Sequence, residues 1–141
     1  GNGYTGSQTG LDYKGAFPSD KISSLIRGKY GLIWDGERID TCSGNVGNYL
    51  RYNNPHKLSM YIVANMPVII WSKAAEAEFV KKNGIGIVIN SLSEIPEKIN
   101  GVSKDDYLKM NSAVKAVKSK IENGKFLLNA LSEIESRMKN A

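Results

Sequence analysis

The chain has 141 residues, of which 41% are hydrophobic and 23% are charged, and its formal net charge is +5. This composition is typical of one ordinary globular domain, and no apolar run is long enough to cross a membrane. The lysines are dispersed among acidic residues and no nucleic-acid motif is present. We therefore interpret the charge as favouring solubility and phosphate-bearing ligands.

Cys42 is the only cysteine, which excludes an internal disulfide framework. No residues with zinc-like spacing surround it, so an inert, partly buried thiol is the first interpretation and a reactive thiol the second. The sequence contains no signal peptide, and we therefore expect a cytoplasmic location.

Residues 1–10 are rich in Gly, Ser, Thr and Asn, and they are expected to form a flexible lead to one domain at 11–141. The letters Gly1-x-Gly3-x-x-Gly6 match the dinucleotide-binding fingerprint. No strand precedes them and no apolar helix follows, so the match does not favour a dinucleotide site.

The first regular elements are expected between residues 11 and 34. A short strand is expected at 11–17, a helix at 18–28 and a second strand at 30–34. The segment 37–53 that follows is polar and rich in Gly and Asn, and a connection of this length usually marks a functional or a disordered loop. Gly44 would allow its backbone to approach a ligand closely, as would Gly47.

The stretch 52–71 contains its own helix start, turn and strand. Asn54 is a favourable N-cap, and Pro55 suits the first helical position. Such a helix start exposes amides and the positive end of the helix dipole, and His56 and Lys57 add two donors in the same turn. This arrangement favours a diphosphate ligand, whereas the alternative is an ordinary capped helix with a solvated lysine.

The same stretch carries the signals for a buried helix face and a buried strand. Leu58, Tyr61 and Ile62 repeat with helical spacing and predict one buried face. Asn65 is expected to end this helix in a left-handed conformation. The nearly unbroken apolar run 66–71 then predicts a parallel strand that is covered on both faces.

The remaining elements continue the alternation of helix and strand. Ser72 is expected to cap a helix that Gly84 ends, and a buried strand follows at 85–89. Residues 91–94 have capping-box spacing for a short turn that Pro96 disturbs. Two helices with apolar stripes complete the chain; their stripes are typical of core packing. The first begins after Ser103, and the second runs from Leu127 to Met138, with Gly124 between them.

The order of these elements predicts an α/β fold, with a Rossmann-like parallel sheet, helices on both faces and two C-terminal helices. Ligands of such sheets bind at the carboxyl ends of the strands. Segments expected at those ends are Phe17-Pro18, Trp34-Asp35-Gly36, Asn54 to Lys57, and Ser72-Lys73. Their convergence predicts a ligand site.

An ordered series of segments resembles one family. They are Tyr13-Lys14-Gly15 with Pro18-Ser19-Asp20, Gly31 to Gly36, Cys42 to Asn45, Tyr52 to Lys57, Met66 to Ala75, and Asn83 to Gly86. They resemble the C-terminal half of bacterial GT-B hexosyltransferases, over roughly residues 13–90. The relevant branch includes enzymes that glucosylate GlcNAc-modified serine-rich adhesins and proteins described as β-1,6-galactofuranosyltransferases.

The resemblance implies that this domain binds a nucleotide-sugar donor, typically a UDP-hexose, without a metal or another cofactor. It assigns the diphosphate to Asn54, His56 and Lys57, the ribose to the helix start near Ser59, and the base to Phe17 and Pro18. It assigns the sugar and the acceptor cleft to Asp35, Gly36 and the loop through Asn45, and a second phosphate or sugar contact to Ser72 and Lys73. The catalytic residue stays unknown, with His56 as one candidate for a general base.

The absence of an Asp-x-Asp motif agrees with handling of the leaving-group charge by protein donors. In this family an N-terminal domain binds the glycan or glycoprotein acceptor, so the chain resembles a fragment of a two-domain enzyme. A homo-oligomer stays open, since an uncovered helical stripe would favour apolar contact.

Two other functions also stay open. One is a non-catalytic nucleotide- or partner-binding module of flavodoxin-like architecture, which would show no preference for UDP. The other is a nucleic-acid-associated protein, which only the net charge favours and which steep salt dependence of DNA binding would reveal. We expect that the protein neither binds nucleic acid nor spans a membrane.

Overall fold

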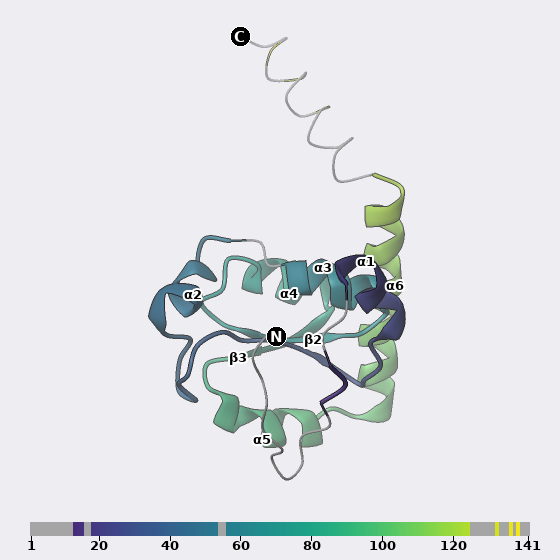
Figure 1. Cartoon of the computed structure of the whole chain (residues 1–141). Helices are drawn as coiled ribbons and strands as arrows, with labels where there is room; N and C mark the ends of the chain where they lie inside the picture. Colours follow the sequence, from purple (N-terminus) through teal and green to yellow (C-terminus); the bar gives the residue numbers. More distant parts are fainter. Residues whose placement is uncertain are drawn as a thin grey trace.

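The computed structural model describes residues 13–15, 18–53 and 56–124, together with residues 132, 136 and 138. Its centre is a three-stranded parallel sheet with the order β1-β2-β3 (Figure 1). The strands are β1 (Gly31–Ile33), β2 (Val68–Trp71) and β3 (Gly86–Ile89). Ile70 of β2 lies between Ile33 of β1 and Val88 of β3 in the register. The predicted Rossmann-like α/β class is confirmed.

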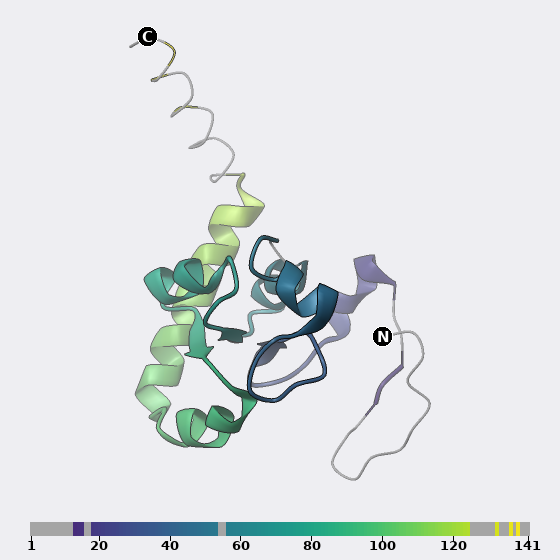
Figure 2. The same ribbon diagram turned by 90° about the vertical axis from the view of Figure 1, so that its left-hand side faces the viewer.

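Helices cover both faces of this sheet, because parallel strands are joined by crossovers that run over the faces. α2, α3 and α4 lie on one side of the sheet, α5 lies on the other, and α6 runs past the sheet; Figure 2 shows the same arrangement from the side. The helices are α1 (Ser19–Leu25), α2 (Gly44–Tyr49), α3 (His56–Val63), α4 (Ala77–Asn83), α5 (Ile95–Asn100) and α6 (Lys104–Glu122). The helix predicted at 18–28 is thus present as the shorter α1.

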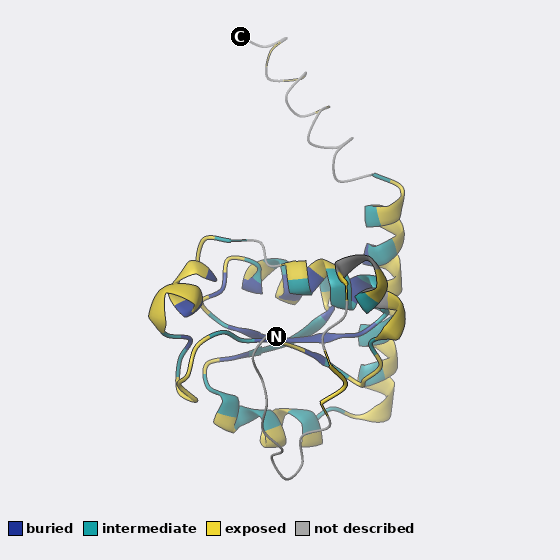
Figure 3. Cartoon of the chain, viewed as in Figure 1, coloured by how far each residue is buried: buried dark blue, intermediate teal, exposed yellow. Residues whose placement is uncertain are grey.

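The central strand β2 is buried along its whole length (Figure 3). β1 and β3 pair with its two edges, so its backbone groups are satisfied within the sheet. Pro67 lies directly before the strand, and its carbonyl oxygen accepts a hydrogen bond from the Gly31 N–H at 2.9 Å. Its missing N–H has no cost at this position, because the sheet requires no backbone donor there. The predicted buried strand at 66–71 is therefore confirmed.

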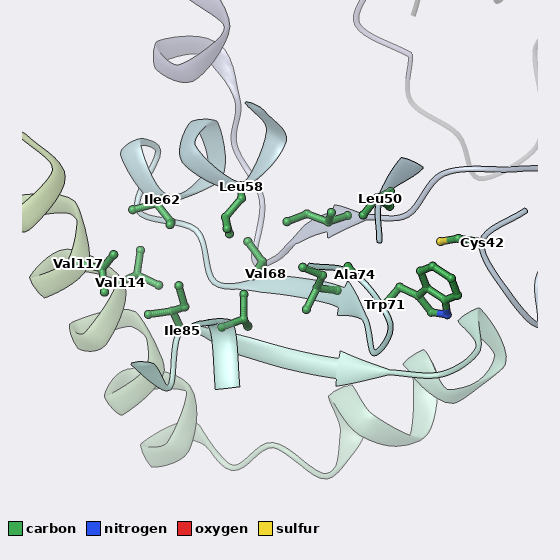
Figure 4. Packing of buried hydrophobic residues seen from close by; sticks show 13 residues of the cluster. Cys42, Leu50, Leu58, Ile62, Val68, Trp71, Ala74, Ile85, Val114 and Val117 are labelled. Carbon is green, nitrogen blue, oxygen red and sulfur yellow. The ribbon is translucent and has the colours of Figure 1, made fainter. Parts of the chain in front are cut away.

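The apolar side chains of the helices meet the sheet in one cluster (Figure 4). Ile62, Ile85, Val114 and Val117 lie near the start of the strands, and Cys42, Leu50, Trp71 and Ala74 lie near their carboxyl ends. Full burial of one such apolar side chain contributes about 1.5–3 kcal/mol. The stripe predicted on α6 is confirmed by the burial of Val114 and Val117.

The ends of the helices agree with the signals in the sequence. Asn65 adopts a left-handed conformation with φ 58°, as does Gly84 after α4 with φ 63°. Before α6, the Ser103 hydroxyl accepts a hydrogen bond from the Asp106 N–H at 3.1 Å. Gly124, two residues after the end of α6, also has a positive φ. Each of these predicted starts and stops is confirmed.

The predicted start of α4 at Ser72 was wrong, because the helix begins at Ala77. The Ser72 hydroxyl donates a hydrogen bond to Asn90 Oδ1 at 2.7 Å, so it joins the chain after β2 to the chain after β3. The Ala75 N–H donates to the Leu50 carbonyl oxygen at 2.9 Å instead of entering a helical turn.

The disturbance expected at Pro96 was also wrong. Residues 92–94 form a short 3₁₀ helix, η1 (Leu92–Glu94), and the predicted capping box between Ser91 and Glu94 is complete. α5 follows directly, and Pro96 lies in its first turn. A missing N–H has no consequence there, since first-turn amides have no intrahelical partner.

Two predictions fall mainly outside the described residues. Of the strand expected at 11–17, residues 13–15 are described and they are not in a strand. Of the second C-terminal helix, residues 132, 136 and 138 are described, each in helical conformation. The remainder of both elements stays a prediction.

The segment 37–53, expected to be a functional or disordered loop, is ordered around α2. Cys42 and Leu50 are part of the core. Gly47, which lies between them in the sequence, is also buried. A Cβ atom on Gly47 would lie 2.7 Å from the carbonyl carbon of Cys42 and 2.8 Å from the carbonyl oxygen of Asp35. This glycine therefore allows one part of the backbone to pack against another.

We expect Gly47→Ala to lower the free energy of unfolding by about 1–3 kcal/mol, because the added methyl group would overlap two backbone atoms. Gly101→Ala is the matched control, since its Cβ would meet the nearest atom at 3.4 Å and its backbone is right-handed. The control should stabilise the protein by about 0.4–1 kcal/mol. Urea denaturation measures both variants, and a Gly47→Ala protein as stable as the parent would contradict the packing described.

Candidate functional site

Residues from separate segments meet at the carboxyl ends of the strands. Asp35 follows β1, and Lys57 lies in the first turn of α3. The ammonium Nζ of Lys57 lies 2.6 Å from Asp35 Oδ1. Two of the predicted site residues are thus in direct contact, although the resemblance assigned them to different parts of the ligand.

The Asp35–Lys57 ion pair is partly open to solvent, with exposed side-chain fractions of 22% for Asp35 and 42% for Lys57. A pair with this exposure contributes only about 0–1 kcal/mol to stability. Its main effect is to fix the position of the ammonium group. An ammonium has three N–H donors, and Asp35 is its hydrogen-bond acceptor within the described part of the chain. The other donors can therefore bind an anionic ligand.

The backbone of Asp35 is held by the loop that leads into α2. Its N–H donates to Cys42 Sγ at 3.5 Å. Gly36 has φ +110°, and a Cβ there would lie 2.6 Å from backbone atoms of Ser43. Burial raises the pKa of the Cys42 thiol, although the hydrogen bond from the Asp35 N–H opposes this shift. The neutral, buried thiol agrees with the inert role predicted for Cys42.

Two tryptophans at the carboxyl ends of β1 and β2 form an aromatic layer. Trp34 and Trp71 meet edge to face, with ring centroids 6.3 Å apart. The indole N–H of Trp34 donates to the Arg38 carbonyl oxygen at 3.1 Å. The guanidinium of Arg51 lies over the Trp71 ring, with 4.9 Å between Cζ and the ring centroid. Arg51 was not predicted from the sequence, because no local motif marks it and only the fold brings it onto Trp71.

Tyr61 sets the distance between α3 and β1. Its ring lies against Gly31, where any Cβ would collide with it, and its hydroxyl donates to the Leu32 carbonyl oxygen at 3.4 Å. Burial raises the pKa of Tyr61, and the Asp35 carboxylate raises it as well. The close approach of α3 to β1 places Lys57 within reach of Asp35.

A shallow hollow of about 510 Å³ lies between the segment that follows Asp35 and the start of α2. It is lined by Gly36, Glu37, Ser43, Gly44, Asn45 and Val46. Its volume falls in the range of small-molecule sites, about 300–1,000 Å³. Gly36 and Asn45 belong to the segment that the resemblance assigns to the sugar and the acceptor cleft.

The other predicted site residues are placed as follows. Ser72 is engaged with Asn90, and Lys73 is exposed; no contact between either and the ion pair is present in the described residues. His56 and Ser59 are exposed on α3, and Pro18 is exposed before α1. Phe17, Asn54 and Pro55 lie outside the described residues. Of the predicted diphosphate contacts, the structure thus describes His56 and Lys57.

Within the described ranges, no three His, Cys, Asp or Glu side chains are grouped so that they could hold a metal ion. No helix in the same part of the chain is both long and apolar enough to cross a membrane.

Comparisons with known proteins agree with the resemblance found in the sequence. Residues 2–134 match the family described as "Glucosyltransferase 3-like, C-terminal domain". Beta-1,6-galactofuranosyltransferase WbbI of Escherichia coli (strain K12) is 39% identical over 130 residues, which are 90% of this chain and 39% of that protein. Glucosyltransferase 3 of Streptococcus gordonii is 28% identical over 119 residues, which are 82% of this chain and 35% of that protein.

A third relative extends the same picture. Glucosyltransferase 3 of Streptococcus parasanguinis is 23% identical over 112 residues, covering 79% of this chain and 32% of that protein. The chain thus spans well under half the length of these relatives. The family match extends over nearly the whole chain and confirms the predicted resemblance. The protein belongs to the family of glucosyltransferase 3-like C-terminal domains.

Proposed function

We propose that this chain is the donor-binding part of a glycosyltransferase that transfers a hexose from a UDP-sugar. The observation that carries the proposal is Lys57, held by Asp35 in the first turn of α3 at the carboxyl ends of a parallel sheet. Sheets of this kind bind nucleotides at that edge. The names of the relatives, a galactofuranosyltransferase and two glucosyltransferases, support a hexose as the transferred group.

The chemistry requires positive charge at this position. Transfer breaks the bond between the anomeric carbon of the sugar and the diphosphate, and negative charge builds up on the leaving UDP. The Lys57 ammonium and the first-turn amides of α3 would stabilise that charge as it forms. In this proposal protein groups supply the positive charge, and no metal or other cofactor takes part.

The remaining assignments follow from the position of the diphosphate. The hollow beside Gly36 would hold the sugar, because Gly36 directly follows Asp35 in the sequence. The acceptor, a glycan or glycoprotein, would be bound by an N-terminal domain, since the chain spans 39% or less of its relatives. His56 is exposed beside Lys57 and stays a candidate for a general base.

Lys57→Ala is expected to weaken UDP binding by roughly tenfold to over a hundredfold, because a hydrogen bond to a charged group contributes about 1.5–3 kcal/mol. Calorimetric titration with UDP measures this change, and titration with ADP measures the preference for the base. Lys82→Ala is the matched control, because Lys82 is an exposed lysine of α4 and its loss should leave UDP affinity within about twofold.

The same titration separates the proposal from its alternative. Weak and equal binding of UDP and ADP, unchanged in Lys57→Ala, would contradict a UDP-sugar site. That result would favour a non-catalytic nucleotide- or partner-binding module.

Asp35→Asn is expected to strengthen UDP binding about threefold. The amide oxygen still accepts from Lys57, while removal of the carboxylate charge removes a repulsion of about 0.7 kcal/mol at roughly 6 Å in water. Asp40→Asn is the control, because Asp40 is an exposed carboxylate paired with Arg38 at 2.6 Å. Calorimetry with UDP compares the two variants, and weaker binding by Asp35→Asn would show that the carboxylate itself contributes to binding the ligand.

A further inference from the structure

Arg51 lies at the same edge of the sheet as the ion pair, but outside every site predicted from the sequence. Its guanidinium Cζ is 4.9 Å from the centroid of the Trp71 ring. Trp71 ends β2 and is 1% exposed, so the ring is a fixed platform. A guanidinium stacked on an aromatic face keeps its N–H groups in its own plane, where they can bind oxygen atoms.

The backbone next to Arg51 is also fixed by the fold. Leu50 is 3% exposed, and its carbonyl oxygen accepts from the Ala75 N–H at 2.9 Å, in the chain that follows β2. Trp71 packs edge to face against Trp34, which directly precedes the carboxylate of the ion pair. Arg51 is therefore held at the same edge of the sheet as the ion pair, by the fixed backbone beside it and by the ring under its side chain.

Arg51 differs from the neighbouring cations in its ion pairing. Lys57 pairs with Asp35, and Arg38 pairs with Asp40, each at 2.6 Å. Within the described residues, no carboxylate forms an ion pair with Arg51. Of Arg38, Arg51 and Lys57, Arg51 is therefore the cation that has no carboxylate partner among the described residues.

We propose that Arg51 is a second cationic contact for the diphosphate of the nucleotide sugar, beside Lys57. The proposal rests on the function proposed above. A guanidinium can donate two parallel hydrogen bonds to phosphate oxygens, whereas an ammonium acts as a point charge. Because a diphosphate carries more charge than a monophosphate, Arg51 favours UDP over UMP.

The test is calorimetric titration of UDP and UMP into the parent chain, Arg51→Gln, Arg51→Lys and the control Arg27→Gln. Arg27 is an exposed arginine after α1, where its guanidinium donates to the Ile26 carbonyl oxygen. Arg51→Gln should weaken UDP binding by roughly tenfold or more and weaken UMP binding less. Arg51→Lys should weaken UDP binding about threefold, and Arg27→Gln should change it less than about twofold.

Each outcome decides the proposal. Unchanged UDP affinity in Arg51→Gln, together with lost affinity in Lys57→Ala, would overturn the role of Arg51 and leave the proposed function standing. A parent chain that binds neither nucleotide would overturn both. Thermal unfolding without nucleotide shows whether Arg51→Gln is folded; if it is not, the result for Arg51→Lys decides. If Arg51→Lys weakens the binding of UDP and of UMP by the same factor, Arg51 has only a packing role and the proposal is overturned.

Discussion

The burial of β2 on both faces is the constraint on which the rest of the domain depends. A strand without solvent contact requires a hydrogen-bonded neighbour on each edge, and β1 and β3 supply them. It also requires apolar cover above and below, which the helices provide. Because all three strands are parallel, their carboxyl ends meet at one edge, and the polar residues that follow them are brought together there.

At this edge, the charged side chains and the contacts that hold them in place come from different parts of the chain. The Asp35–Lys57 pair joins the end of β1 to α3, and Tyr61 packed on Gly31 sets the distance between these two elements. Asp35 and the loop that follows it are supported by close contacts between backbone atoms. Gly36 packs against Ser43, and Gly47 packs against Cys42 and Asp35. Arg51, which has no carboxylate partner within the described residues, instead lies on the ring of Trp71. The site is thus built from contacts that also hold the domain together.

Much of the fold could be predicted because its signals are local. Left-handed ends at Asn65 and Gly84, and the cap at Ser103, are properties of single residues in a short window. The boundary at Ser72 was wrong because its hydroxyl binds Asn90, a residue that is distant in sequence. Lys57 was predicted from a helix start. Its pairing with Asp35, and the position of Arg51, depend on tertiary contacts that no local pattern contains.

The aromatic layer has a further consequence for how this protein can be observed. The sequence contains two tryptophans, and both belong to the layer. Trp71 lies beneath the guanidinium of Arg51, and Trp34 directly precedes Asp35. The entire tryptophan fluorescence of the chain therefore originates at one edge of the sheet. Its emission is an intrinsic spectroscopic reporter of that edge, and it requires neither a label nor a substitution.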